Sequence, residues 1–79
     1  MMECTYKQIF NLNHIACWFV EHNAHETRLL ADGVLVLKCS SLQAAQKELG
    51  RVYTAIGSGL RAAAIVELEH SNELHLVFY

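Results

Sequence analysis

The chain has 79 residues, enough for a single domain over 1–79, with 53% hydrophobic and 18% charged residues. Its net charge is −2 and its lysines and arginines are scattered, so no basic stripe can neutralise a phosphate backbone, which argues against direct nucleic-acid binding. No apolar run is long enough to span a bilayer and no basic amphipathic helix is present, so we expect no membrane partner.

The thiols and the N-terminal residues indicate the compartment. Cys4, Cys17 and Cys39 are odd in number and far apart, so they form neither a disulfide framework nor a C-x-x-C pair. The N-terminal MMECTYKQ has no apolar segment of the signal-peptide kind. We therefore expect a cytoplasmic protein with reduced thiols.

Residues 4–10 alternate in the manner of a first strand. Asn11-Leu12-Asn13 then predicts a turn or a helix start, because asparagine favours both turns and N-caps.

Residues 14–26 fit more than one structure. As a helix they carry one apolar face, whereas the run IACWFV within them is also typical of a strand, and periodicity does not separate the two for so short a run. A third interpretation is a strand over 14–21 with a short helix after Asn23. We favour a second, N-terminal helix within 13–31.

Asp32-Gly33 lies between two apolar runs and also fits two structures. It is a strong type I′ hairpin signal, which would pair a strand at 27–31 with the strand at 34–39. Equally, Gly33 fits the position that follows the end of a helix.

The clearest helix covers about 41–56. Ser40 and Gln43 match a capping box, and Gly57-Ser58-Gly59 provides the C-terminal glycine. Gly50 inside this helix costs about 1 kcal/mol relative to alanine, so we expect another group to pack closely against it.

The C-terminal residues predict a β-hairpin. Side-chain alternation has a period of two, so a three-residue loop over 71–73 keeps one face apolar. That loop would pair Leu68 with Leu76, Val66 with Phe78, and Glu69 with His75.

Together these elements predict an α+β fold with two layers. We expect a mixed or antiparallel sheet of three to five strands, the 41–56 helix, the second helix within 13–31, and the C-terminal hairpin. The connection through the helix is long enough for strands 34–39 and 64–69 to be parallel neighbours.

The predicted sheet is apolar on both faces, and one helix covers only one of them. The other face needs the 13–31 segment, a second copy of the chain, or a different protein. The terminal run LHLVFY would be an aggregation hazard at an unprotected edge, so we expect it to be central in the sheet or paired across an interface.

One set of residues suggests a metal site. On a helix, His14, Cys17, Glu21 and His25 would share a face, and their nitrogen, sulfur and carboxylate groups suit zinc. The alternative is a solvated helix face. Because no catalytic signature surrounds any cysteine or carboxylate, we expect no enzymatic activity and no cofactor.

A second set suggests a protein-binding surface. Acidic residues on the hairpin form a patch that could dock a basic groove, and the alternative is a solvated strand face. Trp18 would be the anchor if exposed, although a lone tryptophan is more often core. The predicted partner-binding residues are Trp18, Glu67, Glu69, Glu73, His75 and Tyr79.

The order of elements from residue 27 onwards is a strand, Asp32-Gly33, the strand VLVLKC, the helix SSLQAAQKELGRVYTAI and the hairpin IVELEHSNELHLVFY. This order resembles that of some small phage-encoded inhibitors, including certain anti-CRISPR proteins. The resemblance covers about half the chain and assigns no functional residue. It implies a domain that binds and blocks a larger nucleic-acid-processing complex, and the modest net charge differs from that of the members that mimic DNA.

The leading functional hypothesis is therefore a non-enzymatic module that binds another protein, of the phage-inhibitor kind. The alternatives are a homodimeric structural or accessory domain, and a small metal-binding protein that uses the residues of the helix face.

Overall fold

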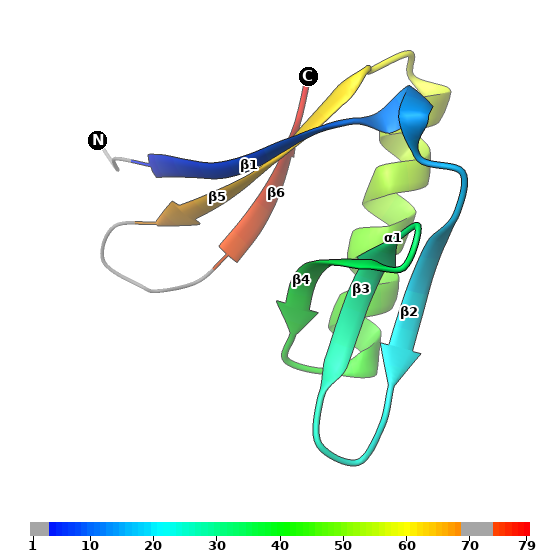
Figure 1. Ribbon diagram of the computed structural model, residues 1–79, viewed down its shortest axis with the longest axis vertical. Helices are drawn as coiled ribbons and strands as arrows, with labels where there is room; N and C mark the ends of the chain where they lie inside the picture. The colour runs from blue at the N-terminus through cyan, green and yellow to red at the C-terminus, as the bar shows by residue number, and fades with distance from the viewer. Residues whose placement is uncertain (1–3, 69–73) are drawn as a thin grey trace.

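The computed structural model describes residues 4–68 and 74–79. Within them, one α-helix and six strands form an α+β fold, as predicted, with two three-stranded antiparallel sheets of order β1-β5-β6 and β2-β3-β4 (Figure 1). In chain order the elements are β1 Cys4–Asn11, the 3-10 helix η1 Leu12–His14, β2 Trp18–His22, β3 Thr27–Ala31, β4 Val34–Cys39, α1 Leu42–Gly57, β5 Ala62–Leu68 and β6 Leu74–Phe78.

The turn between β3 and β4 is the predicted hairpin. Asp32 and Gly33 both have positive φ, 50° and 82°, as a type I′ turn requires, and Ala31 lies opposite Val34. The alternative in which Gly33 ends a helix is wrong. The Asp32 carboxylate also accepts hydrogen bonds from the backbone of Ala16 and Cys17, which ties the approach to β2 to this turn.

The favoured helix within 13–31 is wrong, because apart from the end of η1 its regular structure consists of the strands β2 and β3. Trp18 lies opposite Ala31, so β2 is stabilised by pairing with a strand that a local pattern does not reveal. No short helix follows Asn23 either. Its Oδ1 accepts hydrogen bonds from the N–H groups two and three residues ahead, at 2.8 and 3.0 Å, and the chain turns directly into β3.

The helix α1 agrees with the predicted 41–56 to within a residue at each end. Its N-cap is Ser41, whose hydroxyl accepts a hydrogen bond from the Ala44 N–H at 3.1 Å. The capping box of Ser40 with Gln43 is therefore displaced by one position. Two adjacent serines offer the same hydroxyl group, and the backbone that leaves β4 decides which one caps the helix.

The C-terminal end of α1 is closed by a Schellman motif. Gly59 has φ of 83° and its N–H donates to the Ile56 carbonyl at 3.1 Å, while the Leu60 N–H donates to Ala55 at 3.0 Å. These bonds satisfy carbonyls that have no partner within the helix. The predicted glycine stop is confirmed, with Gly59 as the left-handed residue.

The hairpin of β5 and β6 is confirmed, but its predicted register is wrong. Ile65 lies opposite Leu76 and Val66 opposite His75, so Val66 does not face Phe78. The prediction assumed one apolar face, whereas β5 is buried on both faces from Ala63 to Val66. The expected loop at 71–73, and Glu69 with it, lie outside the described residues.

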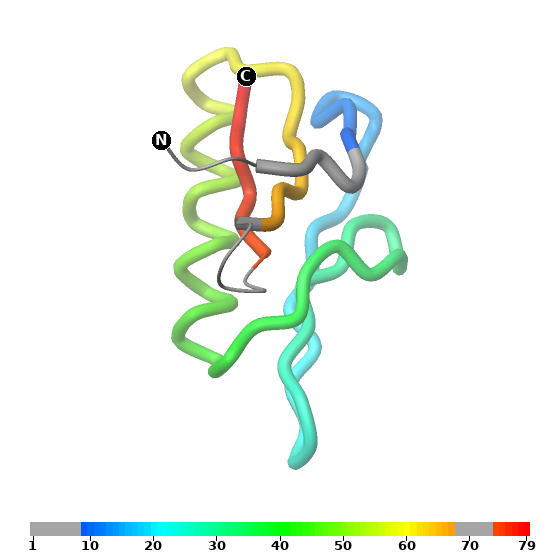
Figure 2. The backbone as a smooth tube through the Cα atoms, turned by 90° about the vertical axis from the view of Figure 1, so that its left-hand side faces the viewer, coloured from blue at the N-terminus to red at the C-terminus, as the bar shows by residue number. Residues whose placement is uncertain are grey.

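The two sheets share one core with α1, which lies along one side of the molecule (Figure 2). Every strand pairing described is antiparallel, and β4 and β5 belong to different sheets, so the parallel arrangement of these strands is wrong. No helix in the described part of the chain is long and apolar enough to cross a membrane. The buried core residues are Leu12, Trp18, Leu29, Ala31, Val36, Leu37, Val52, Ala55, Ala63, Ile65 and Leu76.

Candidate protein-interaction surface

The sheet β2-β3-β4 has one side against α1 and another that we call its outer face. Along β3, Thr27, Leu29 and Ala31 are buried, and the residues between them point the other way. The outer face carries a row of apolar side chains, one per strand, formed by Phe19, Leu30 and Leu35. They lie directly opposite one another, Phe19 with Leu30 and Leu30 with Leu35.

This apolar row is open to solvent at its two ends, with Leu30 half-buried between them. Phe19 is 56% exposed and Leu35 is 40% exposed. A β-bulge in β4 shifts the register between the pairs Leu29–Leu37 and Leu30–Leu35. Because the bulge adds one residue, Val36 and Leu37 are both buried while Leu35 stays on the outer face.

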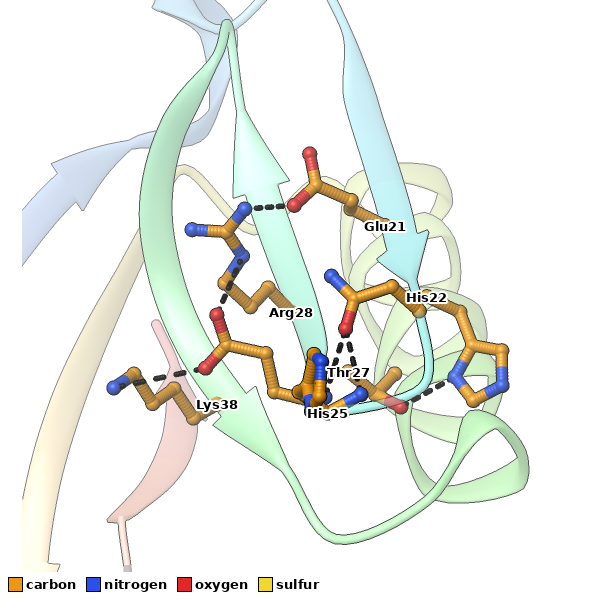
Figure 3. Close-up of polar contacts among 8 residues, drawn as sticks. Glu21, His22, His25, Thr27, Arg28 and Lys38 are labelled. Atoms are coloured by element: carbon orange, nitrogen blue, oxygen red, sulfur yellow. Dashed lines mark hydrogen bonds and ion pairs between the residues drawn. The ribbon is translucent and has the colours of Figure 1, made fainter.

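A charged row lies on the same face beside the apolar one, and Figure 3 shows its side chains. Glu21, Arg28 and Lys38 lie opposite one another across the three strands. Arg28 forms ion pairs with Glu21 and Glu26, the latter at 3.4 Å, and Lys38 lies 3.8 Å from Glu26. Every side chain in these pairs is about one-third exposed or more, and each pair therefore contributes little to the free energy of unfolding.

On the opposite side of the sheet, a hydrogen bond between two side chains joins β2 to β3. His22 Nδ1 and Thr27 Oγ1 lie 2.7 Å apart and form a hydrogen bond across the end of the hairpin (Figure 3). Thr27 is buried, and this contact supplies its hydroxyl with a partner. The outer face is thus presented by a hairpin that is held at both ends, by this contact and by the Asp32 turn.

An apolar centre with a charged border is the anatomy of a protein–protein interface. The centre supplies the surface that gains from leaving water, and the border supplies register and partner choice. Phe19 is the aromatic anchor in this arrangement. These features make the outer face the candidate interaction surface.

The structure separates the residues predicted for partner binding. Trp18 is 7% exposed and belongs to the core, so it does not meet the condition of exposure set for an anchor. Glu67 and His75 are half-buried on β5 and β6, and Tyr79 is exposed at the other end of this strand pair, opposite Ala62. Glu69 and Glu73 lie outside the described residues.

The predicted metal ligands do not share a helix face, because that helix does not exist. His14 is in η1, Cys17 precedes β2, Glu21 is on the outer face and His25 is in the turn before β3. No group of three or more potential ligands is found among residues 4–68 and 74–79.

Cys39, at the end of β4, is the thiol whose surroundings alter its chemistry. Partial burial raises the pKa of this thiol, and the negative charge of Glu48 raises it further. A raised pKa leaves less thiolate at neutral pH, which is the opposite of what a nucleophile needs.

The residues that sequence reasoning missed are Phe19, Leu30 and Leu35. A signal for two of them was present, because a two-residue Asp32-Gly33 turn places Leu30 opposite Leu35. Phe19 could not be added, since its strand was interpreted as a helix.

Comparison with protein-family models, with curated proteins and with solved structures finds no match to this chain.

Proposed function

We propose that this protein is a non-enzymatic binding module that recognises another protein through the outer face of β2-β3-β4. The single observation that carries the proposal is the in-register row of exposed Phe19, half-buried Leu30 and exposed Leu35 next to the charged row. Three apolar side chains in line cost free energy in water unless a partner covers them.

The charged border supports a choice of partner. Glu21 and Lys38 occupy opposite edges of the face, with Arg28 between two carboxylates. A partner with charges in the complementary order is attracted at both edges, and a partner with the reverse order is repelled. Specificity would then come from the border and affinity from the apolar row.

A second copy of the chain is the other candidate partner. About a twofold axis parallel to β3, Glu21 of each copy would face Lys38 of the other, and Phe19 would face Leu35. The same axis would bring Arg28 of each copy together, each paired with Glu21 and Glu26 of its own chain. The edges of the face are thus self-complementary, and this order favours the homodimer hypothesis. Sedimentation at increasing protein concentration separates it from the first, because a homodimer gains mass without any added partner.

The inhibitor role remains a proposal that rests on the order of elements from β3 to β6. Such a module would act by occupying a surface of a larger nucleic-acid-processing complex. The proposal includes a cytoplasmic location, which is supported by the free thiols of Cys17 and Cys39, since free thiols persist in reducing compartments.

Affinity capture with matched variants tests the proposal. The bait is the wild-type chain, the double variant Phe19→Ser with Leu35→Ser, or Tyr53→Ser. Tyr53 is a matched control, because it is 55% exposed on α1 whereas Phe19 is 56% exposed. Proteins retained by wild type and Tyr53→Ser but lost with the double variant support the proposal, and equal retention by all three refutes it.

A further inference from the structure

The strand β6 is at the edge of its sheet. The order β1-β5-β6 gives it one paired neighbour among the described strands. Tyr79 and Ala62 exchange both backbone hydrogen bonds, at 2.9 and 3.3 Å. Because antiparallel pairs alternate, the backbone groups of Leu74, Leu76 and Phe78 point away from β5.

The chain itself uses one of these outward groups. Arg51 of α1 donates from Nη2 to the Leu76 carbonyl at 3.0 Å, and its guanidinium lies over the Phe78 ring, 5.3 Å from the centroid. The side of β6 that faces away from β5 is therefore within reach of the helix and binds a donor there. A strand that added to this edge would supply the same kind of donor.

Two hollows lie along α1 on this side, one at each end of β6. The first, of about 530 Å³, includes Leu74 in its lining, and the second, of about 480 Å³, includes Phe78. Lys47 lines both of them, so they adjoin at the helix. Each falls within the range of about 300–1,000 Å³ that ligand sites usually span.

Gly50 lies in the second hollow. A Cβ added there would meet no atom of the described residues within 4 Å, so none of these residues is the close neighbour expected for this glycine. A glycine inside a helix costs about 1 kcal/mol relative to alanine. The absent side chain leaves room over the helix for a group from another molecule.

The charges around these hollows are mostly positive. Lys38, Lys47 and Arg51 line them. Lys38 lies 3.8 Å from Glu26, which is outside the lining, and the one carboxylate in the lining, Glu48, is paired with Arg51 at 3.0 Å. Lys47 has no ion pair among the described residues. An acidic occupant is therefore the one that complements this rim.

We propose that the groove between α1 and the free edge of β6 binds an extended, acidic segment of another protein as an added strand. The segment's N–H groups bond to the outward carbonyls of β6, and one of them replaces Arg51 on Leu76. The released guanidinium, still paired with Glu48, then binds a carboxylate of the segment. Lys38 lines the first hollow and also lies at the edge of the outer face of β2-β3-β4, and the other residues of the two sites are different.

The test uses a blocked heptapeptide of alternating valine and glutamate, titrated into ¹⁵N-labelled protein and followed by NMR. We expect saturable shifts at the amides of Leu74, Leu76 and Phe78. The matching valine–lysine peptide should bind at least about tenfold more weakly, a difference of 1.4 kcal/mol. No saturable shift at millimolar peptide, equal binding of both peptides, or shifts centred on β1, β2 or β3 would overturn the proposal.

The substitution Gly50→Leu distinguishes an effect on peptide binding in the groove from an effect on folding. The substitution fills the second hollow and improves helix propensity, so we expect at least about tenfold weaker peptide binding with no loss of thermal stability. Unchanged binding in Gly50→Leu would contradict the site. The double variant Phe19→Ser with Leu35→Ser should bind the peptide as wild type does. The proposal for the groove and the proposal for the outer face are therefore tested independently.

Discussion

Arg51 on α1 reaches the Leu76 carbonyl of β6 across 3.0 Å, and this hydrogen bond joins the helix to the edge of the sheet β1-β5-β6. The same guanidinium pairs with Glu48 and lies over Phe78. One side chain thus makes three different kinds of contact, which link two elements that are far apart in the sequence.

We expect Arg51→Ala to lower the free energy of unfolding by about 1–2 kcal/mol, because a charged donor to a backbone carbonyl is lost with its packing on Phe78. Lys47→Ala, on the same side of α1, should change it by less than about 0.5 kcal/mol. Urea unfolding measures both. Equal effects of the two substitutions would show that the bond to Leu76 contributes nothing.

The two serines before α1 give a second prediction. Ser41→Ala should lower the free energy of unfolding by about 1 kcal/mol, since the Ala44 N–H loses its acceptor. Ser40→Ala should have little effect, because the Ser40 hydroxyl is outside the cap. Thermal unfolding of the two variants distinguishes them, and a larger loss in Ser40→Ala would restore the capping box read from the sequence.

Alanine substitution should change the stability of the protein in opposite directions at Gly50, within α1, and at Gly59, in its C-terminal cap. Gly50→Ala is expected to stabilise by about 1 kcal/mol, because the added Cβ meets nothing within 4 Å. Gly59→Ala should destabilise, because its φ of 83° is costly for any residue with a Cβ. Calorimetry would contradict this if both substitutions shifted the melting temperature in the same direction.

Cys39 gives a pH-dependent prediction. Burial and the charge of Glu48 raise the pKa of this thiol, so less thiolate is present at a given pH. Glu48→Gln removes one of the two causes, and the pKa should fall, although not to that of an exposed cysteine. The rate of Cys39 alkylation at neutral pH should therefore rise in this variant, as mass spectrometry of labelled peptides would show. An unchanged pH profile would mean that Glu48 does not act on the thiol.

The parts of the fold that depend on local chemistry could be predicted from the sequence. The sequence predicts the α1 stripe and its glycine stop, and it predicts the hairpin at Asp32-Gly33 as one of two structures, because each depends on residues within a few positions of one another. The strand β2 could not be predicted in this way, since IACWFV suits both a strand and a helix. Pairing of Trp18 with Ala31, which decides the matter, is a tertiary contact.

The register of β5 with β6 and the residues of the outer face depend on tertiary contacts that the sequence does not display. β5 is buried on both faces, so alternation along it did not select a partner for Val66. Trp18 was considered as an anchor because of its size, whereas Phe19, the next residue, is the one that points outward. A shift of one residue in a strand moves a side chain to the other face.

The central claim is that the outer face of β2-β3-β4 is covered by a partner. Hydroxyl-radical footprinting of the free chain and of the chain bound to its captured partner measures this directly, with mass spectrometry as the readout. Oxidation of Phe19 and Leu35 should fall several-fold in the complex, while oxidation of Tyr53 on α1 stays the same. Unchanged oxidation of Phe19 and Leu35 in a complex that protects another surface would contradict the account.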